Sequence, residues 1–180
     1  IILPTLAMMA KEMCEEEEQE KDLEVVFLNL LNEKIHEARE QLIERFEWIC
    51  SQDPASAKFM YENGLMAGYI PEEGIRSALK HGTLAIGQLG LAETLQILVG
   101  CDHTEEKGME LAKRIEQMFK DRCALFKEQY KLNFGVYYTP AENLCYTAMM
   151  KFREKYGRIE NVSDKEYFTK ICEILDSLEI

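Results

Sequence analysis

An alternating segment that leads straight into a capped helix constrains the fold of this chain more than any other feature. In "LNFGVYY", residues 132–138, large apolar side chains recur at every second position, which is typical of a half-buried strand. Thr139, Pro140 and Glu142 then occupy the N-cap, the first position and the third position of a helix predicted over 140–156. The junction therefore predicts an α/β fold.

The same junction suggests a place where phosphate could bind. A strand that feeds a capped helix puts free backbone N–H groups and the positive end of a helix dipole at the carboxyl edge of a sheet. Phosphates are bound at such edges in α/β proteins. A capping box is also a common structural device with no ligand, so both interpretations stay open on the residues alone.

Helical periodicity dominates the rest of the chain. Apolar residues recur at steps of three and four over 22–50 and over 105–130, and both are predicted to be long amphipathic helices. Segment 83–99 is apolar on nearly every side, which indicates a buried helix or a buried strand followed by a helix, and we predict the helix. Residues 1–4 end in proline and favour a short strand, and 72–79 favours a short helix. We expect one predominantly helical α/β domain.

Charge and composition exclude some partners. The chain has 33 acidic and 21 basic residues, a formal net charge of -12, and no basic cluster that could follow a phosphate backbone. We therefore expect no nucleic-acid partner. No apolar run approaches the length of a membrane span, so no membrane partner is expected either. The six cysteines are widely spaced without a CxxC pair, which favours reduced thiols and a cytoplasmic location.

No catalytic or metal-binding residue is predicted from the residues themselves. Cys101, Asp102 and His103 carry metal-binding groups, but three consecutive residues cannot easily surround one ion. Cys123 lies on the apolar side of the second long helix and is interpreted as a core residue rather than a nucleophile. Glu116 is the one polar residue on that apolar stripe.

Several strings resemble one enzyme family, in the same order and at similar distances. They are "IILPTLA", "LKHGTLAIGQLGLAETLQILVG", "LNFGVYYTPAENLC", "KFREKYG" and "NVSDKEYFT". On these strings the chain resembles the anaerobic ribonucleoside-triphosphate reductases, the oxygen-sensitive glycyl-radical class. The resemblance covers roughly residues 1–169 and is strongest over 79–169.

The resemblance implies a ten-stranded α/β barrel surrounded by helices, in a homodimer that reduces ribonucleoside triphosphates to deoxyribonucleotides. A glycyl radical, formed with the help of an activating radical-SAM enzyme, generates a thiyl radical that takes the 3′ hydrogen of the substrate, and formate is the common reductant. The finger-loop cysteine, the glycyl loop and a four-cysteine zinc site would lie outside residues 1–180. We therefore expect an internal fragment of the catalytic barrel, with no catalytic residue, cofactor or metal of its own.

The resemblance also assigns a role to the junction. In this family substrate phosphates are held at a helix N-terminus that follows a strand. The implied substrate-binding residues are Thr139, Pro140, Ala141, Glu142 and Asn143. Their role would be to position the phosphates through backbone N–H groups, with no proton transfer.

Two features depart from the family pattern. Thr5 stands where the family has the arginine of "LPR". Residues 164–180 depart from the family's extended chain, and a capping-box pattern over 163–166 predicts a helix instead. An alternative function therefore stays open, in which the chain is a non-catalytic helical binding or structural module, or a truncated reductase remnant.

Overall fold

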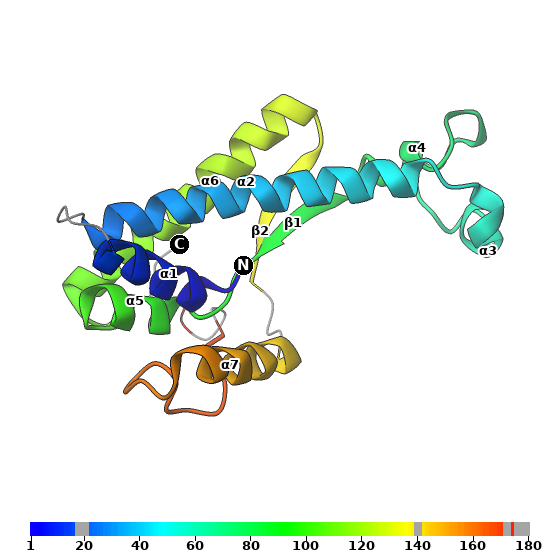
Figure 1. Cartoon of the computed structure of the whole chain (residues 1–180). Helices are drawn as coiled ribbons and strands as arrows, with labels where there is room; N and C mark the ends of the chain where they lie inside the picture. Colours follow the sequence, from blue (N-terminus) through cyan, green and yellow to red (C-terminus); the bar gives the residue numbers. More distant parts are fainter. Residues whose placement is uncertain (17–21, 139–141, 171–173, 175–180) are drawn as a thin grey trace.

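The computed structural model describes residues 1–16, 22–138, 142–170 and 174, and it is mostly helical with one small parallel sheet (Figure 1). The elements in chain order are α1 (Leu3–Glu16), α2 (Leu23–Cys50), the 3-10 turn η1 (Pro54–Ala57), α3 (Lys58–Glu62), the 3-10 turn η2 (Pro71–Glu73), α4 (Arg76–Leu79), β1 (Thr83–Gly87), α5 (Leu91–Val99), α6 (Glu106–Tyr130), β2 (Asn133–Tyr137) and α7 (Glu142–Tyr156).

The two long helices confirm the prediction from periodicity. α2 begins after Asp22, whose carboxylate accepts hydrogen bonds from the N–H groups of Glu24 and Val25 at 2.9 and 3.4 Å. Such an N-cap stabilises a helix by about 1 kcal/mol. α6 ends at Lys131, which adopts a left-handed conformation with φ of 54°.

The sheet is a parallel pair, and its second strand confirms the strand predicted over 132–138. β1 and β2 pair in register from Thr83 opposite Asn133 to Gly87 opposite Tyr137. α5 and α6 connect the two strands, as a parallel pair requires a long crossover. The coarse expectation of a predominantly helical α/β chain is therefore confirmed, while the ten-stranded barrel stays a proposal.

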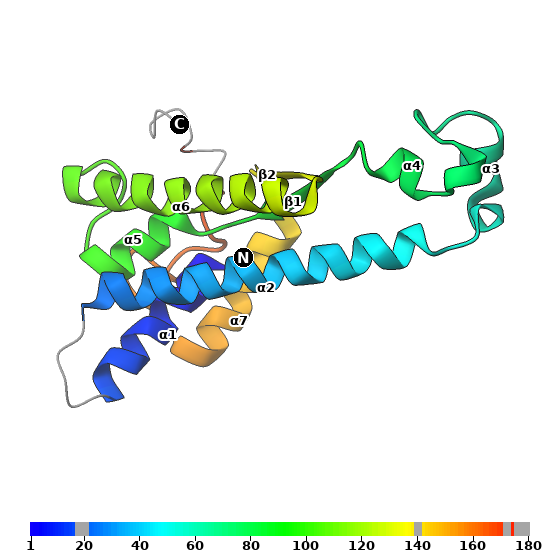
Figure 2. The same cartoon turned by 90° about the horizontal axis from the view of Figure 1, so that it is seen from above.

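Helices α1, α2, α5 and α6 pack with one face of the sheet around the main core (Figure 2). Its fully buried large side chains include Leu3, Phe27, Leu31, Ile35, Leu91, Leu95, Ile115, Phe119 and Phe126. Burial of each such side chain contributes about 1.5–3 kcal/mol. α7 lies on a second apolar cluster that contains Leu89, Phe152 and Phe168. That residues 1–180 form a single domain stays a prediction.

Two expectations near β1 are wrong in part. Segment 83–99 is not one helix, because β1 and α5 divide it, so the alternative of a strand followed by a helix is confirmed. Gly90, with φ of 81°, adopts the left-handed conformation that ends the extended chain before α5. Residues 1–4 form no regular strand. Ile2 makes one parallel bridge with Leu89, and α1 starts at Leu3. Pro4 is compatible with this helix start, because the N–H that proline lacks would have no partner in the first turn.

The helix predicted from the capping-box pattern at 163–166 is also wrong over the described residues. Turns, bends and irregular chain occupy 163–170. The hydroxyl of Ser163 donates to the carbonyl of Gly157 and accepts from the N–H of Ile159, both at 2.8 Å. Ser163 therefore closes the loop after α7 instead of capping a new helix.

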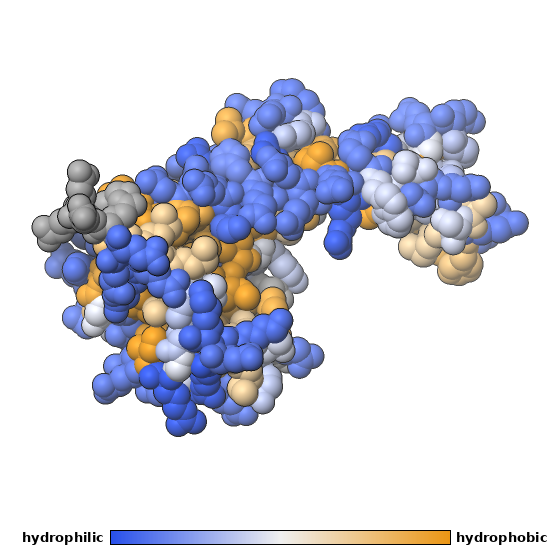
Figure 3. Space-filling model, viewed as in Figure 1, coloured by the Kyte–Doolittle hydropathy of each residue, from blue (hydrophilic) through white to orange (hydrophobic). Residues whose placement is uncertain are grey.

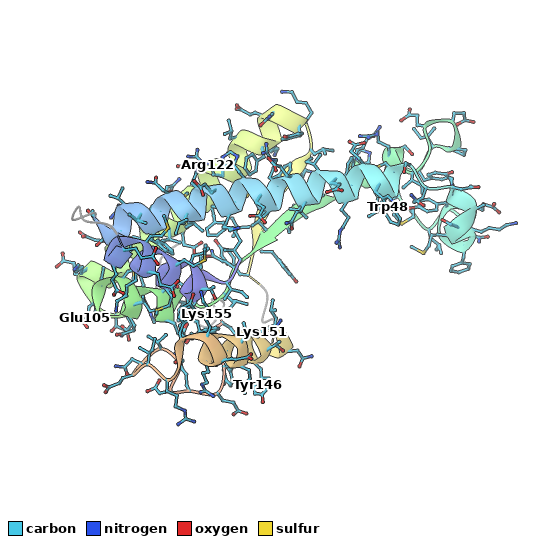
Figure 4. All side chains as sticks on the ribbon, in the orientation of Figure 1. Trp48, Glu105, Arg122, Tyr146, Lys151 and Lys155 are labelled. Carbon is cyan, nitrogen blue, oxygen red and sulfur yellow. The ribbon has the colours of Figure 1, made fainter. Side chains whose placement is uncertain are left out.

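The chain between α2 and β1 forms an arm that extends away from the rest of the molecule (Figures 1 and 2). The single helix predicted over 72–79 is divided between η2 and α4. The guanidinium of Arg76 lies 5.1 Å above the ring of Phe46 and pairs with Glu47, which ties α4 to α2. Trp48, also on α2, remains 63% exposed (Figure 4).

Candidate functional site

The candidate site is the edge of the sheet at which both strands end. Gly87 and Tyr137 are the last register partners of β1 and β2. α5 begins at Leu91 after the first strand, and α7 begins at Glu142 after the second. In α/β proteins, ligands bind outside the carboxyl ends of parallel strands. The edge therefore has the general geometry of a ligand site.

The two faces of the strand pair differ in side-chain size. The face toward α6 carries Leu84, Ile86, Phe134 and Val136, which pack into the main core. The opposite face carries Thr83, Ala85, Gly87, Asn133, Gly135 and Tyr137. A methyl group added at Gly135 would lie 3.4 Å from the nearest atom, so packing among the described residues does not demand glycine there. At Ala85, Gly87 and Gly135 little or no side chain covers the backbone of this face, whereas Tyr137 at its edge is large and 57% exposed.

A buried polar cluster lies behind the same edge, on the side of α6. The Gln88 amide group donates to Oε1 of Glu116 at 2.6 Å, and the Tyr138 hydroxyl donates to Oε2 of Glu116 at 2.9 Å. Gln88 is the first residue after β1, and Tyr138 is the first residue after β2. One carboxylate from α6 thus joins the two strand ends.

Burial sets the electrostatics of this cluster. Glu116 is 1% exposed, and removal from water raises the pKa of its carboxyl, while the hydrogen bonds from Tyr138 and Gln88 act in the opposite direction. The pKa of Tyr138 is also raised, first by burial and then by the neighbouring charge of Glu116. Both shifts favour the uncharged forms. The cluster is therefore suited to holding the strand ends, and it offers no base that is charged and open to solvent.

The start of α5 is occupied by the chain's own groups. Glu93, in its first turn, is fully buried, and its Oε1 accepts hydrogen bonds from the N–H and the hydroxyl of Thr169 at 2.9 and 2.6 Å. Lys165 pairs with the same oxygen, and the N–H of Gly90 donates to the carbonyl of Thr169 at 3.3 Å. A carboxylate thus lies at the positive end of this helix, where a phosphate would otherwise bind.

The structure describes only part of the predicted substrate-binding set. Thr139, Pro140 and Ala141 lie outside the described residues. Glu142 is the first residue of α7, and Asn143 is exposed in its first turn. A helix thus follows β2 as predicted, but its predicted N-cap and first position lie outside the described residues, and the convergence of these five residues on one ligand stays a prediction.

Sequence reasoning missed most of the buried polar groups at this edge. Glu116 was noted as a polar residue on an apolar stripe, which was the available signal, but no partner could be named for it. Gln88 and Glu93 are the polar exceptions within a nearly continuous apolar run, and this was a second signal. Tyr138 gave none, because it continues the alternation of the strand.

Asp102 and Cys123, two of the residues considered for metal binding or nucleophilic chemistry, have structural roles. The carboxylate of Asp102 accepts hydrogen bonds from the N–H and the hydroxyl of Thr104 at 2.8 and 2.6 Å, which close a turn and lower the pKa of Asp102. Cys123 is 5% exposed, and burial raises the pKa of its thiol. Over the described parts of the chain, no three His, Cys, Asp or Glu side chains are arranged to hold a metal ion. Within the same parts, no helix combines the length and apolarity needed to cross a membrane.

Comparison with known proteins decides the family. The family model for anaerobic ribonucleoside-triphosphate reductase matches residues 1–175. The chain belongs to this family. The anaerobic ribonucleoside-triphosphate reductase of Enterobacteria phage T4 is 31% identical over 146 residues, which cover 79% of this chain and 23% of the phage protein. The Escherichia coli K12 reductase is 26% identical over 155 residues, which cover 81% of this chain and 21% of that protein.

Solved anaerobic reductases share the fold. The Thermotoga maritima anaerobic ribonucleotide reductase with glycerol in the active site superposes with a TM-score of 0.68 at 19% identity, over 94% of this chain and 25% of that one. The same reductase in complex with dATP and CTP superposes with a TM-score of 0.69 at 19% identity, over 94% and 25%. The chain thus spans about a fifth to a quarter of the length of the reductases it matches.

Proposed function

We propose that this chain is part of the catalytic barrel of an oxygen-sensitive anaerobic ribonucleoside-triphosphate reductase, and that it supplies a section of the substrate-binding wall. The full enzyme would convert ribonucleotides to deoxyribonucleotides by radical chemistry. Membership of the reductase family supports the reaction class. The observation that carries the role of this section is the shared carboxyl edge of β1 and β2, where β2 leads toward the start of α7 beside an open face of small side chains.

The proposed wall holds phosphates through the backbone at the start of α7. Thr139 caps the helix, Pro140 shapes the turn, and the N–H groups of Ala141, Glu142 and Asn143 donate to phosphate oxygens. The preference for α7 over α5 rests on the start of α5 being occupied, because the buried Glu93 carboxylate and the N–H of Gly90 are both hydrogen-bonded to Thr169. These groups position the substrate and transfer no proton.

The remaining parts of the reaction belong, in this proposal, to other segments of the full-length protein. These are the glycyl radical, the thiyl-forming cysteine, the formate site and the structural zinc. The proposed partners are a ribonucleoside triphosphate, an activating radical-SAM enzyme and a second copy in a homodimer. The proposed location is cytoplasmic, in keeping with the thiols of Cys14, Cys50, Cys101 and Cys123, which form no disulfide. The solved T. maritima reductase with dATP and CTP makes CTP a suitable probe.

Calorimetric titration of the chain with CTP tests the wall. Asn143→Asp adds a negative charge in the first turn of α7, where it would compete with phosphate, and we expect CTP affinity to fall about two- to fivefold. Asn63→Asp, at the far end of the arm, makes the same change in net charge and serves as the matched control. Equal CTP affinities for the two variants would contradict the proposed site.

The coding sequence that flanks the chain tests the reaction class separately. The proposal expects a cysteine-bearing loop before residue 1, and paired cysteines with a glycyl-radical loop after residue 180. A continuous reading frame that lacks all three would refute the reductase activity and favour the non-catalytic module. In either case the chain by itself is expected to form no deoxyribonucleotide when supplied with formate and an activating enzyme.

A further inference from the structure

The cluster of Gln88, Glu116 and Tyr138 links the side chains of α6 to the ends of both strands, in addition to the backbone pairing of β1 with β2. Gln88 leaves β1, Tyr138 leaves β2, and Glu116 projects from the middle of α6. The side chains of Gln88 and Glu116 are 3% and 1% exposed. The contact of Gln88 with Glu116 is buried, and the contact of Tyr138 with Glu116 is partly buried.

We propose that Glu116 is a positioning residue that sets the carboxyl edge of the β1–β2 pair and, through Tyr138, the direction in which the chain leaves β2 toward α7. The hydrogen bonds from Gln88 and Tyr138 to Glu116 support the positioning itself. Its importance for substrate rests on the proposed function of this edge. Glu116 would touch no substrate and would act only through the two residues that it holds.

The geometry requires a carboxylate. Its two oxygens accept one hydrogen bond from each strand end, at 2.6 and 2.9 Å. A glutamine at this position would have one oxygen acceptor for two donors, and a leucine would have none. Glutamate is therefore the side chain of this length that offers Gln88 and Tyr138 a separate acceptor oxygen each.

The stability of the core alone does not explain this arrangement. A carboxylate in an apolar stripe loses its hydration, and an apolar side chain of similar volume is often equally stabilising there. The oxygen of the Gln88 amide, Oε1, is buried without a hydrogen-bond partner among the described residues, which adds a further cost. The cluster thus provides a defined geometry at the sheet edge, at some expense in stability.

Tyr138→Phe is the sharpest test, because it removes only the hydroxyl that Glu116 holds. Tyr130→Phe is the matched control, since the Tyr130 hydroxyl is also hydrogen-bonded, to Arg39 at 2.8 Å, and the ring also packs against the main core. The readouts are the backbone amide shifts of Gln88 and Asn143 without ligand, CTP affinity, and thermal stability. Glu116→Gln and Glu116→Leu form a graded pair, in which the glutamine should restore part of what the leucine loses.

The proposal predicts that Tyr138→Phe shifts the amide signals of Gln88 and Asn143 and weakens CTP binding roughly 3- to 30-fold, while Tyr130→Phe changes neither. Glu116→Leu should match or exceed this effect, and Glu116→Gln should be intermediate. If Tyr138→Phe lowers the melting temperature but leaves the amide signals as in the wild type, Glu116 has a merely structural role and the proposal is overturned.

The two proposals fail in different ways. A wild-type chain that does not bind CTP would contradict the substrate wall. The ligand-free amide signals would then decide the positioning on their own. A shift in Tyr138→Phe and Glu116→Leu that is absent in Tyr130→Phe supports it, and the absence of a shift in Tyr138→Phe overturns it. CTP binding by the wild type together with unchanged binding by Tyr138→Phe and Glu116→Leu would leave the wall in place and overturn the role of Glu116.

Discussion

Replacing Gly90 with alanine tests how the chain passes from β1 into α5. Gly90 has φ of 81°, where a residue with a Cβ is strained by about 1–2 kcal/mol. The added Cβ would lie 2.5 Å from both Cδ and Cγ of Pro4. These ring atoms cannot rotate away, so α1 would have to shift, at a further cost of about 1–3 kcal/mol. We expect the free energy of unfolding to fall by about 2–5 kcal/mol.

Gly100→Ala is the matched control at the other end of the same helix. Gly100 has φ of 75°, but an added Cβ would have no atom within 4 Å, so only the backbone strain of about 1–2 kcal/mol is expected. Urea unfolding followed by circular dichroism measures both losses, and for a protein of this size the Gly90 variant should melt roughly 4–20 °C lower. Equal losses for the two variants would refute the packing of α1 against the turn before α5.

Two further predictions concern buried carboxylates, with the exposed Glu110 as the control for both. Because burial raises the pKa of Glu116, the folded protein holds more protons than the unfolded chain, and stability should decrease as pH rises from about 4.5 through the folded-state pKa. Denaturant titrations at several pH values measure how the free energy of unfolding depends on pH. Glu116→Gln should weaken this dependence and Glu110→Gln should not. An unchanged dependence in Glu116→Gln would contradict the raised pKa of Glu116. Glu93→Ala should lower the free energy of unfolding by about 2–4 kcal/mol and speed proteolysis near Thr169, because the N–H and hydroxyl of Thr169 lose their acceptor. Proteolysis at the rate of Glu110→Ala would argue against that contact.

The sequence predicted the elements that carry their own local signal. The long stripes of α2 and α6 and the alternation of β2 are properties of side-chain spacing, and the structure follows them closely. Segment 83–99 was harder, because a strand and a helix buried on most sides are both apolar all round. The strand and the helix are separated at Gly90, which has a left-handed backbone and packs against Pro4, a contact with a distant part of the chain that the local pattern does not reveal.

The candidate site was less predictable than the fold. A helix after β2 could be predicted, because the residue pattern that indicates it is local. The polar cluster could not, since Gln88 and Glu116 become neighbours only after α5 and α6 carry the chain across the sheet. Likewise, the buried Glu93 depends on Thr169, which returns to α5 only after α7 and the turn at Ser163. A sequence reveals a polar or charged site most readily when the interacting residues are close together in the chain.

The exposed surfaces are consistent with a section of a larger enzyme. Apolar side chains gather below the hydrophilic outer side of α2, between α2 and α7 (Figure 3). On α7 itself, Tyr146 is 47% exposed and points away from the sheet (Figure 4). Since the chain spans about a fifth to a quarter of the related reductases, we expect other segments of the full protein to lie against part of this surface.

The most direct test of the central claim is a CTP titration of the isotopically labelled chain, followed through its backbone amide signals. The proposed wall predicts saturable shifts at residues 141–143 and at the strand ends near Gly87 and Tyr137, with the signals of the arm unchanged. Shifts confined to the arm, or no shift at residues 141–143 at saturating CTP, would contradict the assignment of this sheet edge as the substrate-phosphate wall.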